Sequence, residues 1–267
     1  MPAKKRRSAA RSEAESASKE SSKRAKNALR SIAQENICPV SHGLMVDPVM
    51  AEDGCLYERK SIEEVIRRKG GSLRSPMTNN PMGSKIMIAR NARNIIESLV
   101  SSNLIDDEDL VAGYHERKLV LDAQKAIGLK MKQKAEDGDP VAMVSLGLMF
   151  DNGIHGFEKD YKLAYRWFTK SADLGNIHGM GHVGFCFLWG HGVDKNVAHG
   201  TALLVRAAEN GSGYACYVLG LYYSRGRYGF PKDKKEAKHW LTKSLDSELF
   251  KDKAASKLRE LEDDQEE

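Results

Sequence analysis

Two cysteines and a histidine in the first quarter of the chain could act as metal ligands. Cys38 and His42 lie four positions apart, and Cys55 follows Cys38 by 17 positions. A structural zinc site takes four thiolate or imidazole ligands, which usually arrive in close pairs such as C-x2-C. Neither cysteine has such a partner, and the next histidine is His115, beyond the helices predicted for this region. We therefore expect no metal site and interpret both cysteines as small buried residues.

The elements that position these residues can be predicted from local patterns. Residues 48–51 and 55–57 are typical of two short strands joined by a hairpin turn, in which Gly54 supplies a positive φ. Ser61 stands three positions before Glu64, which predicts a capping box at the start of a helix. The helix has apolar residues at helical spacing, namely Ile62, Val65 and Ile66.

A second helix closes this region. Residues 92–100 carry apolar side chains at helical spacing, and we expect Ile95, Ile96, Leu99 and Val100 to form the buried face. The whole unit has about 65 residues, and a domain of this size buries little apolar surface. We therefore expect polar cross-links between side chains to stabilise the domain in place of a metal ion.

A set of fixed positions in this region matches one known family in order and spacing. The positions are Cys38-Pro39-Val40-Ser41, Met45, Asp47-Pro48-Val49, Gly54, Tyr57-Glu58-Arg59, Ile62 and Ser75-Pro76-Met77-Thr78. They resemble the U-box, a relative of the RING domain that replaces both zinc ions with hydrogen bonds and salt bridges. The resemblance implies ubiquitin ligation without a cofactor: the domain holds a charged ubiquitin-conjugating enzyme so that a substrate lysine attacks the thioester. It also implies that neither Cys38 nor Cys55 forms a thioester.

The resemblance further implies a surface that binds the conjugating enzyme. It comprises Val40 and His42 in the first loop, Val65 on the central helix and Pro76 in the second loop, with Asn79 at the position that orients ubiquitin. A role in the core or at the solvent-exposed surface is the competing interpretation for Val40, His42 and Val65.

The region departs from the family pattern in three places. Asn79 stands where many members carry a basic residue, and an amide donates without charge assistance. Ile88-Ala89 replaces a Pro-Asn pair, and Val65 stands where a larger residue is frequent. These departures keep open an alternative function, a non-catalytic scaffold or adaptor with a degenerate U-box.

The second half of the chain is a repeat with a period of 36 or 37 residues. The segments LGLMFDNG, VGFCFLWG and LGLYYSRG begin at residues 146, 183 and 219. Such a period predicts a helical solenoid. We expect Gly147, Gly184 and Gly220 to allow close helix approach, and Trp167, Leu203 and Trp240 to fill the space between units. The pattern resembles Sel1-like repeats, relatives of the tetratricopeptide repeat, which implies that a client protein binds the concave side.

The aromatic, cysteine and histidine residues of the repeats are expected to be structural. We interpret the aromatic residues as core rather than ligand contacts, namely Phe150, Tyr165, Phe187, Trp189, Tyr222 and Tyr223. Cys186 and Cys216 are expected to fill helix interiors. The histidines of the middle repeat, His178, His182, His191 and His199, lack the spacing of a metal site.

Charge is concentrated at the start of the chain. Residues 1–33 contain ten Lys or Arg and three Glu, a net charge of +7, which leaves −2 for the other residues of a chain with a net charge of +5. A folded part with this charge is not typical of a nucleic-acid-binding surface, and no apolar run is long enough to span a membrane. Residues 1–33 have the composition of a disordered segment. The basic clusters at 4–7 and 23–26 resemble a bipartite nuclear import signal, with a solubilising tail as the alternative.

These observations predict a mainly α protein with a small α+β domain. We expect a disordered basic tail at 1–33, a U-box at 34–104, a linker helix at 105–124, a solenoid of about three repeats at 125–255 and an acidic tail at 256–267. Four cysteines without a secretory signal indicate a reducing compartment, either cytoplasmic or nuclear. The expected partners are a ubiquitin-conjugating enzyme, ubiquitin, a client on the repeats and a second copy through the U-box.

Overall fold

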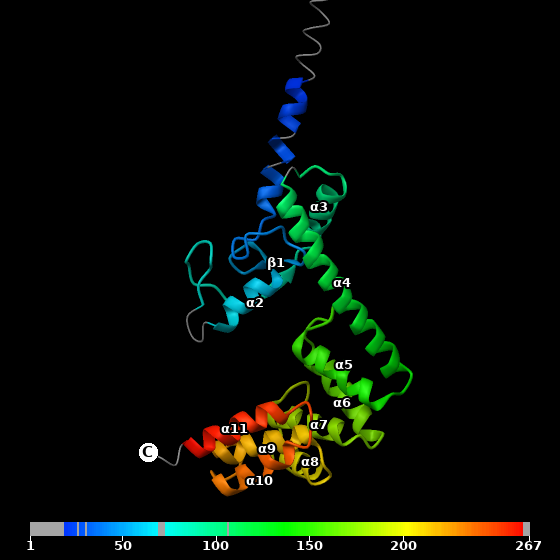
Figure 1. The fold of residues 1–267 in the computed structure, drawn as a ribbon, viewed down its shortest axis with the longest axis vertical. Coiled ribbons are helices and arrows are strands. Elements are labelled where there is room, and N and C mark those ends of the chain that lie inside the picture. The colour runs from blue at the N-terminus through cyan, green and yellow to red at the C-terminus, as the bar shows by residue number, and fades with distance from the viewer. Residues whose placement is uncertain (1–18, 26, 30, 69–72, 106, 264–267) are drawn as a thin grey trace, which may run out of the picture. The chain divides into compact units, whose positions relative to one another are not determined.

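The computed structural model describes residues 19–25, 27–29, 31–68, 73–105 and 107–263 (Figure 1). The chain divides into two compact units, with the boundary between Val120 and Leu121. Within the described residues, none of the helices combines the length and the apolar composition that crossing a membrane requires.

The first unit contains a three-stranded antiparallel sheet in the order β2-β1-β3. β1 (Pro48–Ala51) and β2 (Leu56–Glu58) form the predicted hairpin, and Gly54 has the expected positive φ of 77°. β3 (Ile86–Ile88) pairs with the other edge of β1 and was not predicted. It has three residues and exposes Met87, so it lacks the alternating pattern by which a strand is recognised.

Two helices pack on this sheet. α2 (Arg59–Arg68) begins two residues before Ser61, so the predicted capping box is wrong. β2 passes directly into the helix, and the backbone N–H of Arg59 donates to the carbonyl of Asp47 at 3.0 Å. The residue that immediately precedes β1 therefore anchors the helix start.

The closing helix, α3 (Arg90–Ser101), is confirmed, but its buried face differs from the prediction. Ile96, Leu99 and Val100 are buried together with Ala92, whereas Ile95 is 45% exposed. Successive residues of a helix are about 100° apart, and the stripe through 92, 96 and 99 turns Ile95 to the solvent.

The described part of the predicted disordered tail is helical at residues 19–25, 27–29 and 31–35. The basic cluster at 4–7 and part of the cluster at 23–26 lie outside the described residues. Ala33 is buried, and the side-chain amide of Asn36 donates to the carbonyl of Ile32 at 2.8 Å. A polar composition excludes a core of its own, but Ala, Lys and Arg are good helix formers, which explains the difference.

A long helix, α4 (Glu108–Glu136), follows. The carboxylate of Asp107 accepts from the N–H of Leu110 at 3.0 Å, as a helix cap does. In the first unit, Tyr114 is buried and the Lys118 ammonium pairs with the Glu97 carboxylate of α3 at 2.8 Å. Residues 108–124 of the predicted linker are therefore part of a longer helix.

The second unit is a helical solenoid of the predicted kind, whose helices pack in consecutive pairs. Its helices are α5 (Pro140–Asn152), α6 (Tyr161–Asp173), α7 (Ile177–Trp189), α8 (Val197–Glu209), α9 (Gly213–Arg225), α10 (Lys234–Ser244) and α11 (Lys251–Asp263). The first helix of each repeat starts at a side-chain N-cap, from Asp139, Asn176 or Ser212. It ends at a left-handed glycine, Gly153, Gly190 or Gly226. These caps explain why the sequence repeats at the helix ends.

The predicted close approach at glycines is confirmed. A methyl group on Gly184 would lie 2.9 Å from the carbonyl oxygen of Gly200, and one on Gly220 would lie 2.6 Å from Leu241. Trp240 is buried, while Trp167 packs half-buried on the core around Leu146.

Both cysteines of the repeats are buried, as predicted. α11 extends into the predicted acidic tail and buries Ala254 and Leu261 with residues of α10. The described part of that tail therefore belongs to the helical core.

Candidate functional site

Loop 1, residues 37–44, is a turn closed by its own backbone. Ile37 and Leu44 form a β-bridge, and the N–H of Cys38 donates to the carbonyl of Gly43 at 2.9 Å. Cys38 is fully buried, and its sulfur accepts from the N–H of Ser41 at 3.5 Å. His42 has a φ of 54° and is exposed. The thiol of Cys38 is thus part of the loop's internal structure.

Loop 2, residues 73–82, is closed in the same way. The hydroxyl of Ser75, which is buried, accepts from the backbone N–H groups of Met77 at 3.1 Å and Thr78 at 2.9 Å. The guanidinium of Arg74 donates to the carbonyl of Asn79 at 2.8 Å. Asn79 has a φ of 58°, a conformation in which Asn is favoured among residues other than Gly. The loop therefore presents Pro76 and Asn79 to the solvent on a defined backbone.

A buried tyrosine joins the hairpin to loop 2. The hydroxyl of Tyr57, a fully buried residue, donates to the carboxylate of Asp53 at 2.6 Å. Burial alone would raise the pKa of Asp53, but hydrogen bonds with Ser75, Tyr57 and the N–H of Cys55 outweigh it and lower the pKa. Burial and the Asp53 carboxylate raise the pKa of Tyr57. The hairpin and loop 2 are thus linked by a charge-assisted network.

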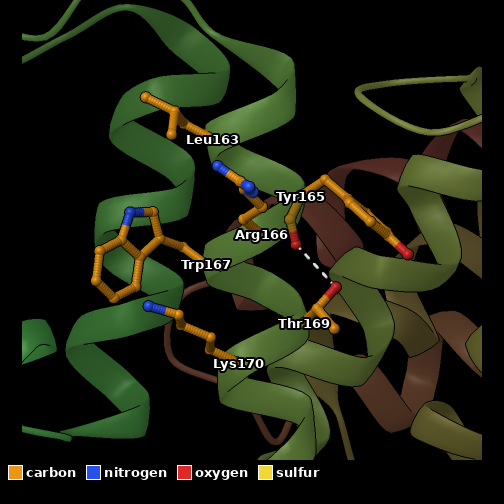
Figure 2. Close-up of a pocket in the computed structure, with 6 residues that line it drawn as sticks. All are labelled: Leu163, Tyr165, Arg166, Trp167, Thr169 and Lys170. Carbon is orange, nitrogen blue, oxygen red and sulfur yellow. Dashed lines mark hydrogen bonds between the residues drawn. The ribbon is translucent and has the colours of Figure 1, made fainter.

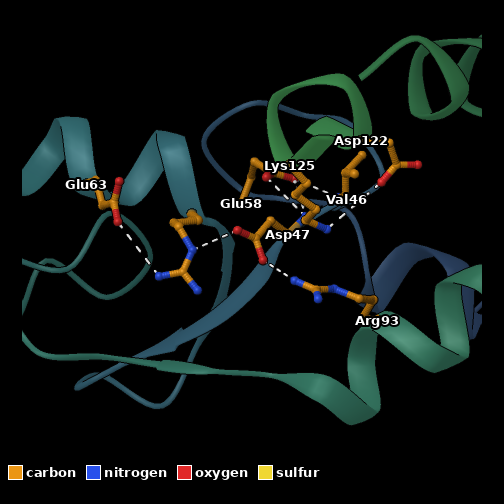
Figure 3. Close-up of polar contacts among 8 residues, drawn as sticks. Val46, Asp47, Glu58, Glu63, Arg93, Asp122 and Lys125 are labelled. Carbon is orange, nitrogen blue, oxygen red and sulfur yellow. Dashed lines mark hydrogen bonds and ion pairs between the residues drawn. The ribbon is translucent and has the colours of Figure 1, made fainter. Parts of the chain in front are cut away.

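A second network is centred on Asp47 (Figure 3). Its carboxylate accepts from Arg59 Nε at 2.7 Å and pairs with the guanidinium of Arg93 on α3. Glu58 accepts from the backbone N–H groups of Val46 at 2.7 Å and Asp47 at 3.2 Å. Burial raises the pKa of Glu58, partly opposed by these bonds. This network ties α2, α3 and the segment after loop 1 together, as the sequence analysis expected of polar cross-links.

The two cysteines discussed as metal ligands have other partners, and Cys55 is half-buried rather than buried as predicted. Cys38 accepts from Ser41, and the Cys55 thiol donates to the carbonyl of Asp53 at 3.9 Å. In the described part of the chain, no group of three His, Cys, Asp or Glu side chains is arranged to hold a metal ion.

The five residues predicted to bind the conjugating enzyme lie on three segments. Val40 and His42 are in loop 1, Val65 is half-buried on α2, and Pro76 and Asn79 are exposed in loop 2. That they form one surface stays a prediction. Sequence reasoning missed Arg93 and an arginine of α4, Arg117, which lie far along the chain from their partners Asp47 and Leu44.

In the second unit, one aromatic residue interpreted as core is exposed. Trp189, the last residue of α7, is 46% exposed, in contrast to Tyr222, which is buried as predicted. Its indole N–H donates to the Tyr222 hydroxyl at 3.2 Å, and its ring lies 5.5 Å from that of Tyr228. The ammonium of Lys195 stands 5.8 Å from the Tyr228 ring. The packing of neighbouring elements around the end of α7, which the residue type does not reveal, explains the difference.

The histidines of the middle repeat are engaged in separate contacts. His182 is buried and stacks between Phe168 and Tyr214, at ring distances of 4.7 and 3.9 Å. Burial lowers its pKa to about 3. His191 stacks on Tyr161 at 3.9 Å, and its Nδ1 lies 3.2 Å from the Asp151 carboxylate.

The exposed indole and the side chains around it form one surface feature of the second unit. We define Trp189, His191, Lys195 and Tyr228 as the Trp189 patch.

A cavity of about 440 Å³ lies along α6. Figure 2 shows Trp167 and Lys170 on one side of this helix and Tyr165 and Thr169 on the other. The Lys170 ammonium stands 4.3 Å from the Trp167 ring, and the Thr169 hydroxyl donates to the Tyr165 carbonyl. These side chains offer no nucleophile paired with a base, so we assign the cavity no chemistry.

Two family models match the chain. The model of the U-box domain matches residues 32–103, and that of the Sel1 repeat matches residues 140–176, 177–212 and 213–248. The relatives include the Arabidopsis thaliana protein named ERAD-associated E3 ubiquitin-protein ligase component HRD3B, 32% identical over 108 residues, or 40% of this chain and 17% of that protein. U-box domain-containing protein 52, also of Arabidopsis thaliana, is 45% identical over 53 residues, or 20% of this chain and 6% of that protein.

The chain thus spans less than a fifth of the length of either relative. Among solved structures, a Sel1 repeat protein from Oxalobacter formigenes is 26% identical, with a TM-score of 0.39, over 47% of this chain and 36% of that chain. The order predicted from the sequence is confirmed: the chain contains a U-box domain followed by three Sel1 repeats.

Proposed function

We propose that the chain is a ubiquitin-protein ligase that acts without a covalent intermediate. The U-box match and the relative that is named as a ubiquitin-protein ligase component support this proposal. The observation that carries it is the form of the two loops, which are closed by their own hydrogen bonds and present exposed residues on a defined backbone. A docking surface that is already ordered loses little conformational entropy when a partner binds.

The proposed reaction needs no group from the ligase that reacts. The amine of a substrate lysine attacks the carbonyl carbon of the thioester on the conjugating enzyme. A C–N bond forms, the C–S bond breaks, the conjugating enzyme's cysteine leaves as a thiolate, and the attacking amine releases a proton to water. The ligase contributes by restricting the charged enzyme to a reactive arrangement. Burial of Cys38 supports this division of roles, since a thioester could not form there without opening loop 1.

The proposed docking residues are Val40, His42, Val65 and Pro76, with Asn79 oriented toward ubiquitin. The test is discharge of ubiquitin from a charged conjugating enzyme to free lysine, with the full chain as catalyst. Val40→Ala and Pro76→Ala should each slow discharge about tenfold when the charged conjugating enzyme is subsaturating, because each variant loses one apolar anchor of the interface. Ile95→Ala is the matched control, because Ile95 is an exposed apolar residue of α3 and belongs to neither loop. Equal discharge rates for all three variants and the natural chain would show that the conjugating enzyme does not bind at the proposed surface.

The alternative function is a scaffold with a degenerate U-box. The neutral side chain of Asn79 favours it, because an amide orients ubiquitin without charge assistance. The left-handed backbone at this position provides a second reason for an asparagine there, which weakens that argument. A natural chain that fails to accelerate discharge while its U-box remains folded would decide for the scaffold.

The repeats are proposed to bind the client, with the Trp189 patch as the contact. An exposed indole held by a hydrogen bond is a rigid apolar anchor, and such residues dominate binding energy at interfaces. Trp189→Ala should reduce ubiquitination of other proteins in cells while self-ubiquitination is retained, as measured by mass spectrometry of ubiquitin remnants on lysine. Leu174→Ala, at an apolar residue 58% exposed outside the patch, is the control. Equal loss in both variants would contradict the assignment.

A further inference from the structure

Loop 1 is braced by a residue that lies outside the matched U-box. The match ends at residue 103, and Arg117 belongs to α4. Its Nη2 donates to the carbonyl of Leu44 at 2.9 Å. The guanidinium also covers Gly43, where an added methyl group would lie 2.7 Å from Nη2. Arg117 therefore lies against Gly43 and Leu44, the two residues that form the C-terminal end of loop 1.

The hydrogen bond from Arg117 joins α4 to loop 1 beside a hollow. A hollow of about 460 Å³ lies at the junction, lined by residues 37 and 41–43 of loop 1 and by residues 107, 109, 110, 113 and 117. Arg117 is one of the residues that line this hollow, and it is exposed to solvent. Replacing Arg117 removes the hydrogen bond to the Leu44 carbonyl and should free the loop.

Charge strengthens the same link. Glu58 accepts from the N–H groups of Val46 and Asp47, immediately after loop 1. Burial raises the pKa of Glu58, and the positive charge of Arg117 opposes that rise. Arg117 thus stabilises the ionised carboxylate that holds the residues following the loop.

We propose that Arg117 is a positioning residue, which holds loop 1 in the form that presents Val40 and His42 to the conjugating enzyme. The inference rests on the proposed ligase function. Arg117 does not act on the thioester. Its loss should therefore raise the concentration of charged conjugating enzyme that gives half-maximal discharge, by roughly three- to tenfold, and leave the saturated rate unchanged.

The structure provides a readout that is independent of activity. Cys38 is fully buried in loop 1, so its alkylation requires the loop to open. Alkylation of the full chain, followed by mass spectrometry of each cysteine peptide, measures this opening, and the buried Cys186 and Cys216 are internal references. Arg117→Gln should speed labelling of Cys38 about three- to tenfold and leave the two references unchanged.

Two further variants separate positioning from a general role in docking α4. Lys118→Gln removes the adjacent pair with Glu97, which joins α4 to α3 without touching loop 1, and should leave Cys38 labelling unchanged. Arg117→Lys keeps the positive charge and a hydrogen-bond donor group but loses the planar guanidinium. The rate of Cys38 labelling in this variant should therefore lie between those of Arg117→Gln and the natural chain.

The outcomes are distinct. Labelling of Cys38 at the natural rate in Arg117→Gln, or equal acceleration in Lys118→Gln, overturns the proposal. A change in saturated discharge rate alone also overturns it. If the natural chain discharges no ubiquitin, the proposed function fails, and the labelling comparison still decides whether Arg117 braces loop 1.

Discussion

Replacing Asp47 by asparagine removes the charge at the centre of the polar network in the U-box. The side chain of Asp47 is 18% exposed, and those of its partners Arg59 and Arg93 are 25% and 29% exposed. Asparagine has nearly the same shape, but it keeps one acceptor oxygen and presents an N–H group toward a guanidinium. The variant therefore tests the charge and leaves the packing almost unchanged.

The expected loss follows from these contacts. A hydrogen bond to a charged partner contributes about 1.5–3 kcal/mol, and Asp47 makes two of them at sites mostly shielded from water. Asp47→Asn loses one outright and weakens the other, so the free energy of unfolding should fall by about 2–4 kcal/mol. This is a large part of the stability that a domain of this size reaches.

The assay must report on the U-box alone. All three tryptophans, Trp167, Trp189 and Trp240, lie in the repeats, so their fluorescence follows only the second unit. Urea-dependent alkylation of Cys38 follows the first unit. With a urea m-value of about 1–1.5 kcal/mol/M for such a domain, the midpoint for Cys38 should fall by more than about 1 M, and the tryptophan transition should not move.

Glu64→Gln is the matched control in the same domain. Glu64 is 46% exposed and pairs with Arg68, which is 75% exposed. Exposed pairs contribute about 0.5 kcal/mol or less, so this variant should unfold like the natural chain. The reasoning is refuted if Asp47→Asn and Glu64→Gln have the same Cys38 midpoint.

Two further predictions concern the repeats, and the tryptophan transition in urea measures both. Burial lowers the pKa of His182 to about 3, whereas the ordinary value, which applies to the unfolded chain, is 6.5. Below pH 6.5 protons therefore bind the unfolded chain preferentially, and the free energy of unfolding falls as the pH falls. Going from pH 7.5 to 5 should cost about 2 kcal/mol. His182→Phe should remove this loss, whereas His239→Phe, at an exposed site, should retain it. Gly184→Ala should destabilise the repeats by about 1–3 kcal/mol, because the added methyl meets backbone of α8 at 2.9 Å. Gly181→Ala is the control on the same helix, because the added methyl would meet its neighbours only at 3.4 Å. It should be neutral or stabilising by up to about 1 kcal/mol. Equal losses of stability in both glycine variants would contradict the close-approach argument.

Local signals in the sequence predicted the hairpin, the two U-box helices and the solenoid. The turn at Gly54 requires a positive φ, and the helix caps Asn176 and Ser212 bind backbone groups only two or three residues away. Interactions of such short range leave their pattern in adjacent residues. The capping box at Ser61 was a false signal of the same kind, because the carbonyl of Asp47, 12 residues upstream of Arg59, fixes the helix start instead.

Contacts between distant segments could not be predicted in this way. β3 pairs with β1 through backbone groups, which every residue type carries, so no side-chain pattern marks it. The link from Arg117 to the carbonyl of Leu44 spans 73 residues, and nothing in the residue types of α4 distinguishes this arginine from a solvated one. The exposure of Trp189 likewise depends on how neighbouring elements pack around the end of α7.

The amino-acid sequence thus determined the kind of protein: two families, their order along the chain, and a small domain that polar side chains cross-link. Only the tertiary structure decided which polar groups meet and which apolar side chains remain uncovered. The physical reason is range, because caps, turns and helical periodicity act over a few residues, whereas ion pairs and burial arise where distant segments come together.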